Sequence, residues 1–319
     1  MPKIFITRQL PESAIAKLRD SFEVDMWPYE DQPIPKGELL NRVESADAIL
    51  SMLTETIDEE VFLKGKQLKV VANMAVGFDN IDVEAAKKHN VIVTNTPEVL
   101  NETTADLTFA LLLATARRIP EAVDFVKENK WSTWSPFLMA GSDVHHKTLG
   151  IVGMGNIGQA VAKRATGFNM NILYHNRSRK REAEQELGVQ YAEFDDLIKQ
   201  SDFVVCMTPL TDETKNMFND DVFKKMKDAA IFINSSRGGV VVEEDLYQAL
   251  INGDIKAAGL DVFKDEPISS DHPLLELSQV VALPHIGSAS VDTRMKMIEL
   301  AVDNISRVLN GEEPVTPVY

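Results

Sequence analysis

The sequence contains a single cysteine, Cys206, among 319 residues. One cysteine cannot form a disulfide within the chain, and it excludes a metal site built from several thiolates. The chain also lacks a long apolar run, since the longest, LTFALLLATA at 107–116, is too short to cross a bilayer. The first residues, MPKIFIT, do not follow the pattern of a signal peptide. We therefore expect a soluble, cytoplasmic protein without a metal site and without membrane association.

Positive charge is scarce, because 33 Lys and Arg face 49 Asp and Glu and give a net charge of -16. Such a surface repels polyanions, so we expect no nucleic-acid partner, although a local basic pocket for one phosphate is still allowed. A hydrophobic content of 44% with 26% charged residues is typical of a globular protein. The length leaves room for two domains.

The first hundred residues contain five short β-branched runs separated by helical patterns. The runs are 3–8, 23–27, 46–53, 68–75 and 91–96, and the helical patterns are 13–22, 36–45, 58–65 and 82–90. This alternation predicts a parallel α/β layer of the flavodoxin type. No glycine-rich phosphate loop occurs within it.

A helix is predicted over 102–118, and its middle is apolar on all faces. Such a helix packs either against a second subunit or inside an ordinary core, and the pattern leaves both open. The aromatic segment WSTWSPFLMAGSDV, 131–144, has no clear periodicity, and we interpret it as a projecting arm.

A second α/β series begins after the arm. Its predicted strands are 148–153, 171–175, 202–207, 229–234, 256–263 and 280–285. The last helix, 290–309, places Ile298, Val302, Ile305 and Leu309 on one face and ends before Asn310-Gly311. The fold class is therefore α/β, with two parallel-sheet domains of the Rossmann and flavodoxin type.

The stretch GMGNIG, Gly153 to Gly158, directly follows a strand pattern and opens a helical one. That context is what a dinucleotide-binding turn requires, whereas the same glycines in a plain strand–helix turn would carry no function. Gly153 permits the tight turn, Gly155 lets the backbone approach a pyrophosphate, and Gly158 lets the helix pack on the strand. The pyrophosphate would meet the helix N-terminus, Asn156 and Ile157 included.

Three polar residues follow the ends of three later strands. They are Arg237 in SSRGG, Glu266 in DVFKDEP and His285 in PHIGS. Alone, each has an ordinary explanation: a surface ion pair, a solvated carboxylate, a core imidazole. In a parallel sheet all three lie at the carboxyl edge, where ligands bind, so together they predict an active site.

The combination GMGNIG, INSSRGG, DVFKDEP and LPHIGSA resembles the D-isomer-specific 2-hydroxyacid dehydrogenase family. NMAVGFDNID, 73–82, and the arm resemble its glyoxylate/hydroxypyruvate reductase branch. The resemblance implies a substrate-binding domain at 1–100 that is completed by a returning helix at 288–319. It also implies an NADP-binding Rossmann domain at 101–287 and an active site in the cleft between the two domains.

For the reaction, the resemblance implies hydride transfer between a nicotinamide and a small 2-keto or 2-hydroxy acid. His285 would donate the proton, Glu266 would hydrogen-bond its other ring nitrogen, and Arg237 would hold the substrate carboxylate. Further substrate contacts are implied at Leu53, Val76, Gly77 and Ser288. Trp134 would reach from the arm into the active site of a partner subunit, and simple packing in a dimer is the alternative role for it. Nucleotide contacts are implied at Thr104, Cys206, Thr208, Pro209, Ser235, Ser236, Arg237, Asp261, His285 and Gly287. We expect a homodimer, because the apolar helix and the arm expose more apolar surface than a soluble monomer tolerates.

The stretch HNRSRK follows the second strand of this domain, where an NAD-specific site presents an acid to the ribose 2′-hydroxyl. Here Asn176, Arg177, Ser178 and Arg179 stand instead, and no acid occurs between Gly158 and Glu182. Arginines and a serine suit a 2′-phosphate, although a basic, solvated helix start has the same composition. We predict NADP(H) in preference to NAD(H).

Alternative functions are a 2-ketogluconate-type reductase or an NAD-linked 2-hydroxyacid dehydrogenase. From another class, a nucleotide-sensing protein like the corepressors built on this fold is also compatible with the motifs. The sequence does not distinguish between glyoxylate, hydroxypyruvate and longer keto acids as the preferred substrate.

Overall fold

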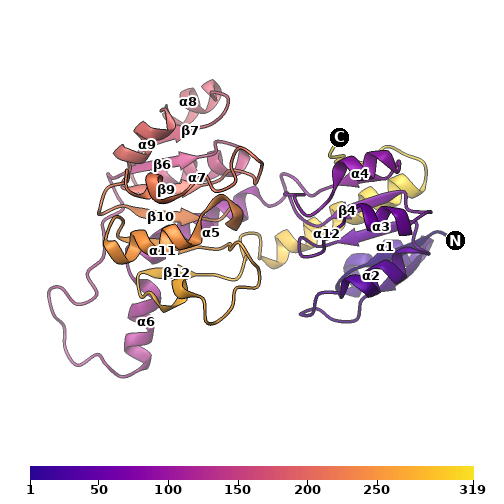
Figure 1. The fold of residues 1–319 in the computed structure, drawn as a ribbon, viewed down its shortest axis with the longest axis horizontal. Helices are drawn as coiled ribbons and strands as arrows, with labels where there is room; N and C mark the ends of the chain where they lie inside the picture. Colours follow the sequence, from indigo (N-terminus) through magenta and orange to yellow (C-terminus); the bar gives the residue numbers. More distant parts are fainter. The chain divides into compact units, whose positions relative to one another are not determined.

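The computed structural model describes all residues, Met1–Tyr319. The chain divides into two compact units, shown in Figure 1. Unit 1 consists of Met1–Leu100 and Ala289–Tyr319, and unit 2 of Asn101–Ser288. Ser288, expected in the returning segment, groups with unit 2 because it follows the loop that Asp261 holds through a bond to Ile286 N at 2.8 Å.

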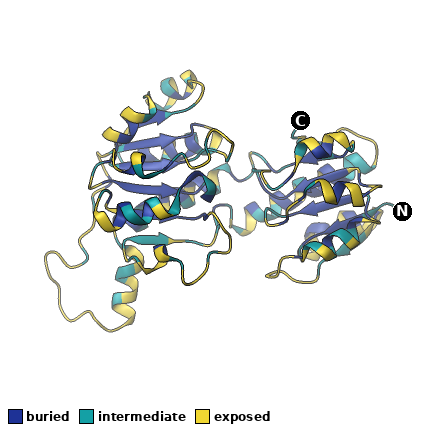
Figure 2. Ribbon diagram, viewed as in Figure 1, coloured by how far each residue is buried: buried dark blue, intermediate teal, exposed yellow.

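Unit 1 contains a five-stranded sheet in the order β2-β1-β3-β4-β5. The strands are β1 (Lys3–Ile6), β2 (Glu23–Met26), β3 (Ala48–Ser51), β4 (Val70–Asn73) and β5 (Ile92–Thr94), and every pairing is parallel. This is the flavodoxin order. All positions of β3 and β4 are buried, as expected for parallel strands covered on both faces (Figure 2). The carboxyl ends of all five strands consequently share one edge.

Helices cover this sheet and include the last one in the chain. They are α1 (Glu12–Ser21), α2 (Lys36–Val43), α3 (Glu59–Lys64), α4 (Val83–Lys88) and α12 (Val291–Leu309). Helix α12 packs against α1, β3 and β4, with Ile298, Val302 and Ile305 buried and Leu309 half-buried at its end. The amphipathic stripe predicted for this helix therefore attaches the C-terminal segment to the N-terminal sheet.

Unit 2 contains a seven-stranded sheet in the order β12-β11-β10-β9-β6-β7-β8. The strands are β6 (Thr148–Val152), β7 (Asn171–His175), β8 (Gln190–Tyr191), β9 (Phe203–Cys206), β10 (Ile231–Asn234), β11 (Ala257–Leu260) and β12 (Val280–Ala282). All pairings are parallel. From β6 the chain runs first to β7 and β8 on one side and then to β9–β12 on the other. The direction thus reverses between β6 and β9, which makes this the switch point where Rossmann folds bind ligands.

Three features of this sheet differ from the sequence prediction. Strand β11 ends at Leu260, three residues before the predicted end at 263. Strand β8 was not predicted, because two residues are too few to show a periodic pattern. Strand β12 ends at Ala282 and not at His285, because Pro284 has no N–H to donate and His285 has a positive φ of 55°. His285 therefore lies in the loop beyond the strand.

Helices of unit 2 lie on both faces of its sheet (Figure 1). They are α5 (Asn101–Ala116), α6 (Ile119–Lys127), α7 (Asn156–Thr166), α8 (Arg181–Leu187), α9 (Phe194–Gln200), α10 (Asp220–Phe223) and α11 (Glu243–Asn252), with short 3₁₀ helices at Gly238–Val240 and Pro273–Glu276. Helix α5 packs against α7, β10, β11 and β12, and it buries Ala105, Phe109 and Leu112. The ordinary core interpretation of its apolar middle therefore applies, although Leu107 and Leu113 are only half-buried.

Helix α6 and the arm that follows it contain exposed apolar side chains. No residue of α6 is buried, and Ile119, Val123 and Val126 are 48%, 44% and 56% exposed. We did not predict this helix, although Pro120 in its first turn is compatible with a helix start, and its apolar residues stay at least partly exposed. Residues 128–147 form a projecting loop without helix or strand, as predicted for the arm (Figure 1).

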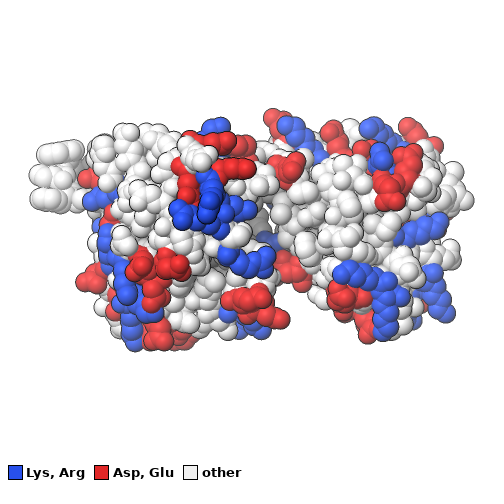
Figure 3. Space-filling model, turned by 90° about the horizontal axis from the view of Figure 1, so that it is seen from above, with Lys and Arg blue, Asp and Glu red and all other residues white.

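Figure 3 shows both charge signs interspersed on the face that it draws, whereas the protruding end at its left is uncharged.

Candidate active site

The turn between β6 and α7 contains three glycines under different constraints. Gly153 has a φ of 104°, and a Cβ there would lie 2.6 Å from the carbonyl carbon of Met207. A Cβ on Gly158 would lie 2.2 Å from the oxygen of Gly153. A Cβ on Gly155 would meet nothing within 4 Å, and no side chain caps the helix that starts at Asn156. The helix N-terminus therefore opens onto free space, where its N–H groups and dipole suit an anion such as a diphosphate.

The segment after β7 is tied to this turn through Asn176. Its Oδ1 accepts from the backbone N–H of Met154 at 3.1 Å, and its Nδ2 donates to the carbonyl of Ser178 at 2.9 Å. Arg177 and Ser178 are exposed. Asn176 therefore shapes the loop and leaves the cationic and hydroxyl groups after it open to a ligand.

The two arginines of this segment differ in their surroundings. Arg179 donates to Glu184 through Nε and Nη2, at 2.7 and 2.9 Å, and its guanidinium lies 5.8 Å from the ring centre of Tyr191. Hydrogen bonds from Arg179 and then Tyr174 lower the pKa of Glu184 to about 2. Glu184 is thus ionised at neutral pH and engages both sides of the Arg179 fork. Arg177, by contrast, makes no bidentate contact with a carboxylate.

The carboxyl ends of β9 and β10 meet around Cys206. Its Sγ lies 3.4 Å from Thr208 Oγ1 and 3.3 Å from Ser236 Oγ, and Pro209 follows directly in the chain. Burial raises the pKa of the Cys206 thiol, so it stays protonated and is a poor nucleophile. The thiol therefore packs this edge and needs no chemical role.

Two buried oxygens near this edge have no hydrogen-bond partner, namely Ser235 Oγ and Asp261 Oδ2. Asp261 is 1% exposed, and its other oxygen accepts from Ile286 N at 2.8 Å. Burial raises the pKa of its carboxyl group. A Cβ on Gly287 would lie 3.3 Å both from Asp261 Oδ2 and from Thr104 Cγ2. Because buried polar atoms normally have partners, the two oxygens fit a bound molecule with hydrogen-bond donors, such as a ribose hydroxyl and a carboxamide.

Arg237, Glu266 and His285 also lie in unit 2, in loops at the same edge. His285 Nδ1 is 2.7 Å from Glu266 Oε2, and the two side chains are 24% and 25% exposed. The other oxygen, Oε1, accepts from the backbone N–H of Phe263 at 2.9 Å. The N–H of His285 in turn donates to the carbonyl of Asp261 at 2.9 Å. Both members of the pair are therefore held by backbone as well as by each other.

The Arg237 loop packs directly on the Glu266 loop because of one glycine. A Cβ on Gly238 would lie 1.8 Å from the carbonyl carbon of Phe263, so any other residue would force the loops apart. Arg237 donates through Nη1 to Ser236 O at 2.9 Å, and its own carbonyl accepts from Asn234 Nδ2 at 2.9 Å. The close packing of the two loops brings the positive charge of Arg237 near enough to act on the Glu266 carboxylate.

The pKa of Glu266 is lowered from its ordinary value in spite of burial. Burial acts to raise it, but the hydrogen bond and charge of His285, the N–H of Phe263 and the charge of Arg237 together outweigh burial. An ionised Glu266 only accepts hydrogen bonds, so Nδ1 of His285 must donate to it. Nε2 is then the ring atom that gains or loses a proton. A proton can thus be held or released at one defined atom.

The remaining predicted substrate residues lie elsewhere. Leu53, Val76 and Gly77 are half-buried in unit 1, in loops at the carboxyl edge of its sheet. The carbonyl of Val76 accepts from Asn95 Nδ2 at 2.8 Å, and that of Gly77 from Asn73 Nδ2 at 2.9 Å. Ser288 is half-buried and ends unit 2, whereas Trp134 is 77% exposed in the arm.

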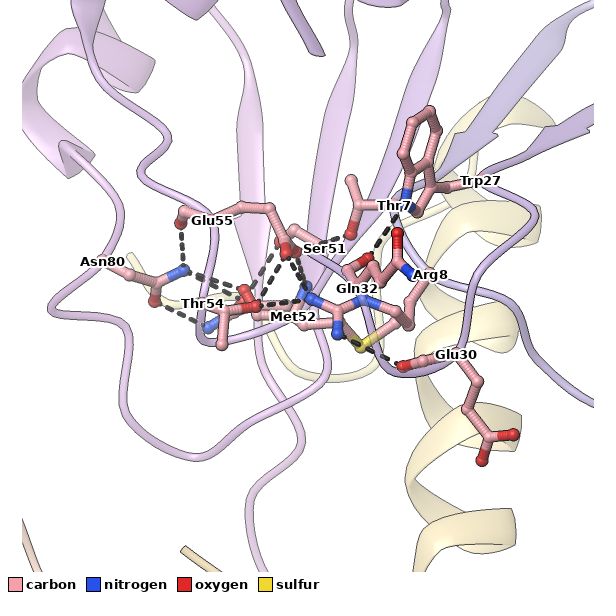
Figure 4. Close-up of polar contacts among 11 residues, drawn as sticks. Thr7, Arg8, Trp27, Glu30, Gln32, Ser51, Met52, Thr54, Glu55 and Asn80 are labelled. Atoms are coloured by element: carbon pink, nitrogen blue, oxygen red, sulfur yellow. Dashed lines mark hydrogen bonds and ion pairs between the residues drawn. The ribbon is translucent and has the colours of Figure 1, made fainter. Parts of the chain in front are cut away.

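A polar cluster in unit 1 was not predicted from the sequence. It surrounds the buried carboxylate of Glu55 and includes Thr7, Arg8 and Asn80 (Figure 4). An acid between two threonines directly after an apolar strand was an available signal. Asn80 also belongs to the stretch 73–82 that carried the family resemblance, but neither residue had been given a role.

Unit 2 thus contains both an open helix N-terminus and a histidine that a carboxylate orients, which is the arrangement of a dinucleotide-dependent enzyme that also transfers a proton. Residues 109–287 match the D-isomer specific 2-hydroxyacid dehydrogenase, NAD binding domain. The chain is 49% identical over 314 residues to the glyoxylate reductase of Korarchaeum cryptofilum, covering 98% of this chain and 94% of that protein.

Solved structures agree with this match. The TT0316 protein from Thermus thermophilus is 44% identical, with a TM-score of 0.93 and coverage of 99% of this chain and 100% of that one. The NADPH-dependent glyoxylate/hydroxypyruvate reductase of Sinorhizobium meliloti, solved with NADP and malonate, is 32% identical with a TM-score of 0.86. That alignment covers 99% of this chain and 96% of the other.

This chain belongs to the D-isomer-specific 2-hydroxyacid dehydrogenase family, which confirms the prediction made from its motifs. It is a nicotinamide-dependent oxidoreductase that acts on 2-hydroxy acids. The predicted fold class, with two parallel α/β sheets, is confirmed as well. None of its helices combines the length and the apolar character needed to span a membrane.

Proposed function

We propose that this protein reduces a small 2-keto acid of the glyoxylate or hydroxypyruvate type to the D-2-hydroxy acid, with NADPH as the reductant. The observation that carries the proposal is the 2.7 Å contact between His285 and Glu266, in the same unit as the open glycine turn. The names of the relatives described above, glyoxylate reductase and glyoxylate/hydroxypyruvate reductase, support the substrate class.

In the proposed reaction the nicotinamide, when bound, supplies the hydride to the carbonyl carbon. Negative charge then develops on the keto oxygen, and His285 donates a proton to it from Nε2. Glu266 keeps Nδ1 protonated and stabilises the imidazolium before transfer, which is a general acid arrangement. Arg237 binds the substrate carboxylate with its planar fork and favours charge on the carbonyl oxygen. Val76 and Gly77, with Leu53, Ser288 and Trp134, would complete the substrate contacts.

The cofactor would be held by groups that the structure leaves available. The N-terminus of α7 would bind the diphosphate, and the unpaired oxygens of Ser235 and Asp261 would accept hydrogen bonds from it. Thr104, Thr208 and Gly287 lie next to these groups and would contact the nucleotide. We propose that Arg177 and Ser178 bind the 2′-phosphate and that NADP(H) is therefore preferred over NAD(H). Arg179 would contribute less, because Glu184 already occupies its fork.

We further propose that the protein is a homodimer assembled through α6 and the arm. Trp131 and Phe137 of the arm are 60% and 85% exposed, and no residue of α6 is buried. A pocket of about 620 Å³ lies between these segments and β12, and its lining combines apolar residues such as Phe125 and Val281 with charged ones such as Glu121 and Lys256. Apolar side chains beside an unfilled pocket fit a second copy of the same surface. In such a dimer Trp134 could reach the partner's active site.

One assay tests the proposed activity. The purified protein would be mixed with NADPH and glyoxylate, hydroxypyruvate or 2-ketogluconate, while oxidation of NADPH is followed by absorbance. We expect turnover of the two small acids and D-glycerate as the product from hydroxypyruvate. Tight NADPH binding without turnover of any of the three acids would contradict the proposal and favour a nucleotide-sensing role.

A further inference from the structure

Glu55 is a buried carboxylate that the proposed chemistry does not use. It lies four residues beyond the end of β3 and is 4% exposed, at the carboxyl edge of the unit 1 sheet. Burying an ionised carboxylate is costly unless hydrogen bonds and an opposite charge compensate. The groups that compensate it therefore indicate what the position is built to hold (Figure 4).

Four donors surround the two carboxylate oxygens of Glu55. Oε2 accepts from Thr7 Oγ1 at 2.6 Å and from the backbone N–H of Met52 at 2.7 Å. Oε1 accepts from Arg8 Nη2 at 3.1 Å and from Thr54 Oγ1 at 2.7 Å. A carboxylate offers about four acceptor sites, so its capacity is fully used. Through these bonds Glu55 fastens the loop after β3 to the residues that follow β1.

Asn80 joins this loop to the next one along the sheet edge. Its Nδ2 donates to the carbonyls of Met52 and Glu55 at 3.1 and 2.9 Å. Its Oδ1 accepts at 3.1 Å from Asn73 Nδ2, the same group that donates to the carbonyl of Gly77 at 2.9 Å. One continuous network thus runs from the Glu55 carboxylate to the backbone at Gly77.

The two loops joined in this way contain Leu53, Val76 and Gly77, the proposed substrate contacts of unit 1. We propose that Glu55 is a positioning residue for the substrate: its carboxylate fixes the loop of Met52–Leu53 and, through Asn80, the spacing of that loop from Val76–Gly77. The proposal rests on the proposed function, since it concerns how the same keto acid is held. It gives a reason for a buried charge at a place where an apolar side chain would fill the same volume at lower cost.

The four-donor arrangement makes the position intolerant of its nearest substitutes. A glutamine has one oxygen, which accepts two of the four hydrogen bonds, and its amide nitrogen would face two other donors. An aspartate is one methylene shorter and would not span from Thr7 to the loop. Glu55→Gln therefore changes charge and hydrogen bonding at almost constant volume, while the side chains of Leu53 and Val76 are untouched.

The test compares three variants with the wild type. Glu55→Gln breaks the centre of the network, and the milder Thr7→Val removes one donor without touching either loop. Asp25→Asn is the matched control, because Asp25 pairs with Arg42 at 2.6 Å in the same unit and belongs to neither loop. For each variant, kcat and KM for glyoxylate would be measured at saturating NADPH, together with KM for NADPH.

We expect Glu55→Gln to raise KM for glyoxylate about tenfold or more, with kcat changed less than about threefold, because loop position affects ground-state and transition-state binding alike. Thr7→Val should shift KM in the same direction by a smaller factor. Asp25→Asn should leave both parameters unchanged, and KM for NADPH should stay constant in all variants. A folded Glu55→Gln protein with wild-type KM for glyoxylate overturns the proposal. If that variant does not fold, an unchanged KM in Thr7→Val overturns it.

Amide hydrogen exchange separates this proposal from the proposed function, because it needs no turnover. The amides of 52–55 and 76–80 should exchange faster in Glu55→Gln than in the wild type, and Asp25→Asn should not change them. Unchanged exchange at 76–80 shows that the two loops are not coupled and overturns the proposal. A wild-type protein that reduces no 2-keto acid contradicts the proposed function alone, and the exchange result then still decides whether Glu55 couples the loops.

Discussion

The proposed 2′-phosphate site makes a quantitative prediction about two arginines only two positions apart. Arg177 is exposed, whereas Arg179 is held by two hydrogen bonds to Glu184 at 2.7 and 2.9 Å. To bind a phosphate, Arg179 would have to exchange these bonds for equivalent ones, so its net gain would be small. Arg177 has no such bidentate partner and only a Coulombic interaction with Glu213, so it gains more from the charge-assisted contact.

A hydrogen bond between charged groups changes an equilibrium constant roughly tenfold to hundredfold. We therefore expect the wild type to favour NADPH over NADH by about that factor in kcat/KM. Arg177→Ala should remove most of the preference, and Arg177→Asp should reverse it, because the carboxylate repels the phosphate and accepts from a free ribose hydroxyl. Arg179→Ala is the matched control and should change the preference no more than about threefold.

The assay is steady-state reduction of glyoxylate with each cofactor. The loss in Arg177 variants should appear mainly in KM for NADPH, because the phosphate is remote from the hydride and binds equally in ground and transition states. Equal use of NADPH and NADH by the wild type would refute the assignment of this segment to a phosphate. A larger effect of Arg179→Ala than of Arg177→Ala would show that the phosphate displaces Glu184.

Four other outcomes are expected. His285→Ala should lower kcat by a factor of about 10²–10⁴, while the NADPH affinity measured by fluorescence titration should stay near the wild-type value. Retention of more than half the turnover would exclude His285 as the proton donor. Glu266→Gln should move the alkaline limb of the kcat/KM profile toward lower pH, because the imidazolium loses its anionic partner; an unshifted profile would contradict the partnership. Because the pKa of Glu266 is lowered in the folded protein, its charge stabilises the fold at pH values above the pKa of the unfolded state. This contribution should be lost as the pH falls through the pKa of the folded state. Thermal unfolding of the wild type and of Glu266→Gln, compared from pH 7 to 3, would detect the loss. Light scattering at micromolar concentration should give a dimer mass, and Phe137→Asp should shift it toward the monomer.

Much of the fold and part of the candidate site were predictable, because the residue types involved have few substitutes. Gly153 and Gly158 are required by backbone that approaches within 2.6 and 2.2 Å of the Cβ position, so their spacing marks the turn. Regular alternation of buried strands and helical patterns likewise indicated two parallel sheets. Helix α6 and strand β8 were missed, since one buries no side chain and the other has two residues. Local pattern predicts an element only where it is long enough and meets a core.

The sequence by itself determined which chemical groups occur at which strand ends: Arg237, Glu266 and His285 in unit 2, and a basic segment after β7 in place of an acid. Only the tertiary structure decided how those groups are used. It brought Glu266 to 2.7 Å from His285 across 19 residues, and it paired Arg179, but not Arg177, with both oxygens of Glu184. It also gathered Thr7, Glu55 and Asn80 from three separate loops into one buried network. The physical reason is that hydrogen bonds depend on distance and direction in space, which the backbone path sets, whereas residue order gives only the candidates.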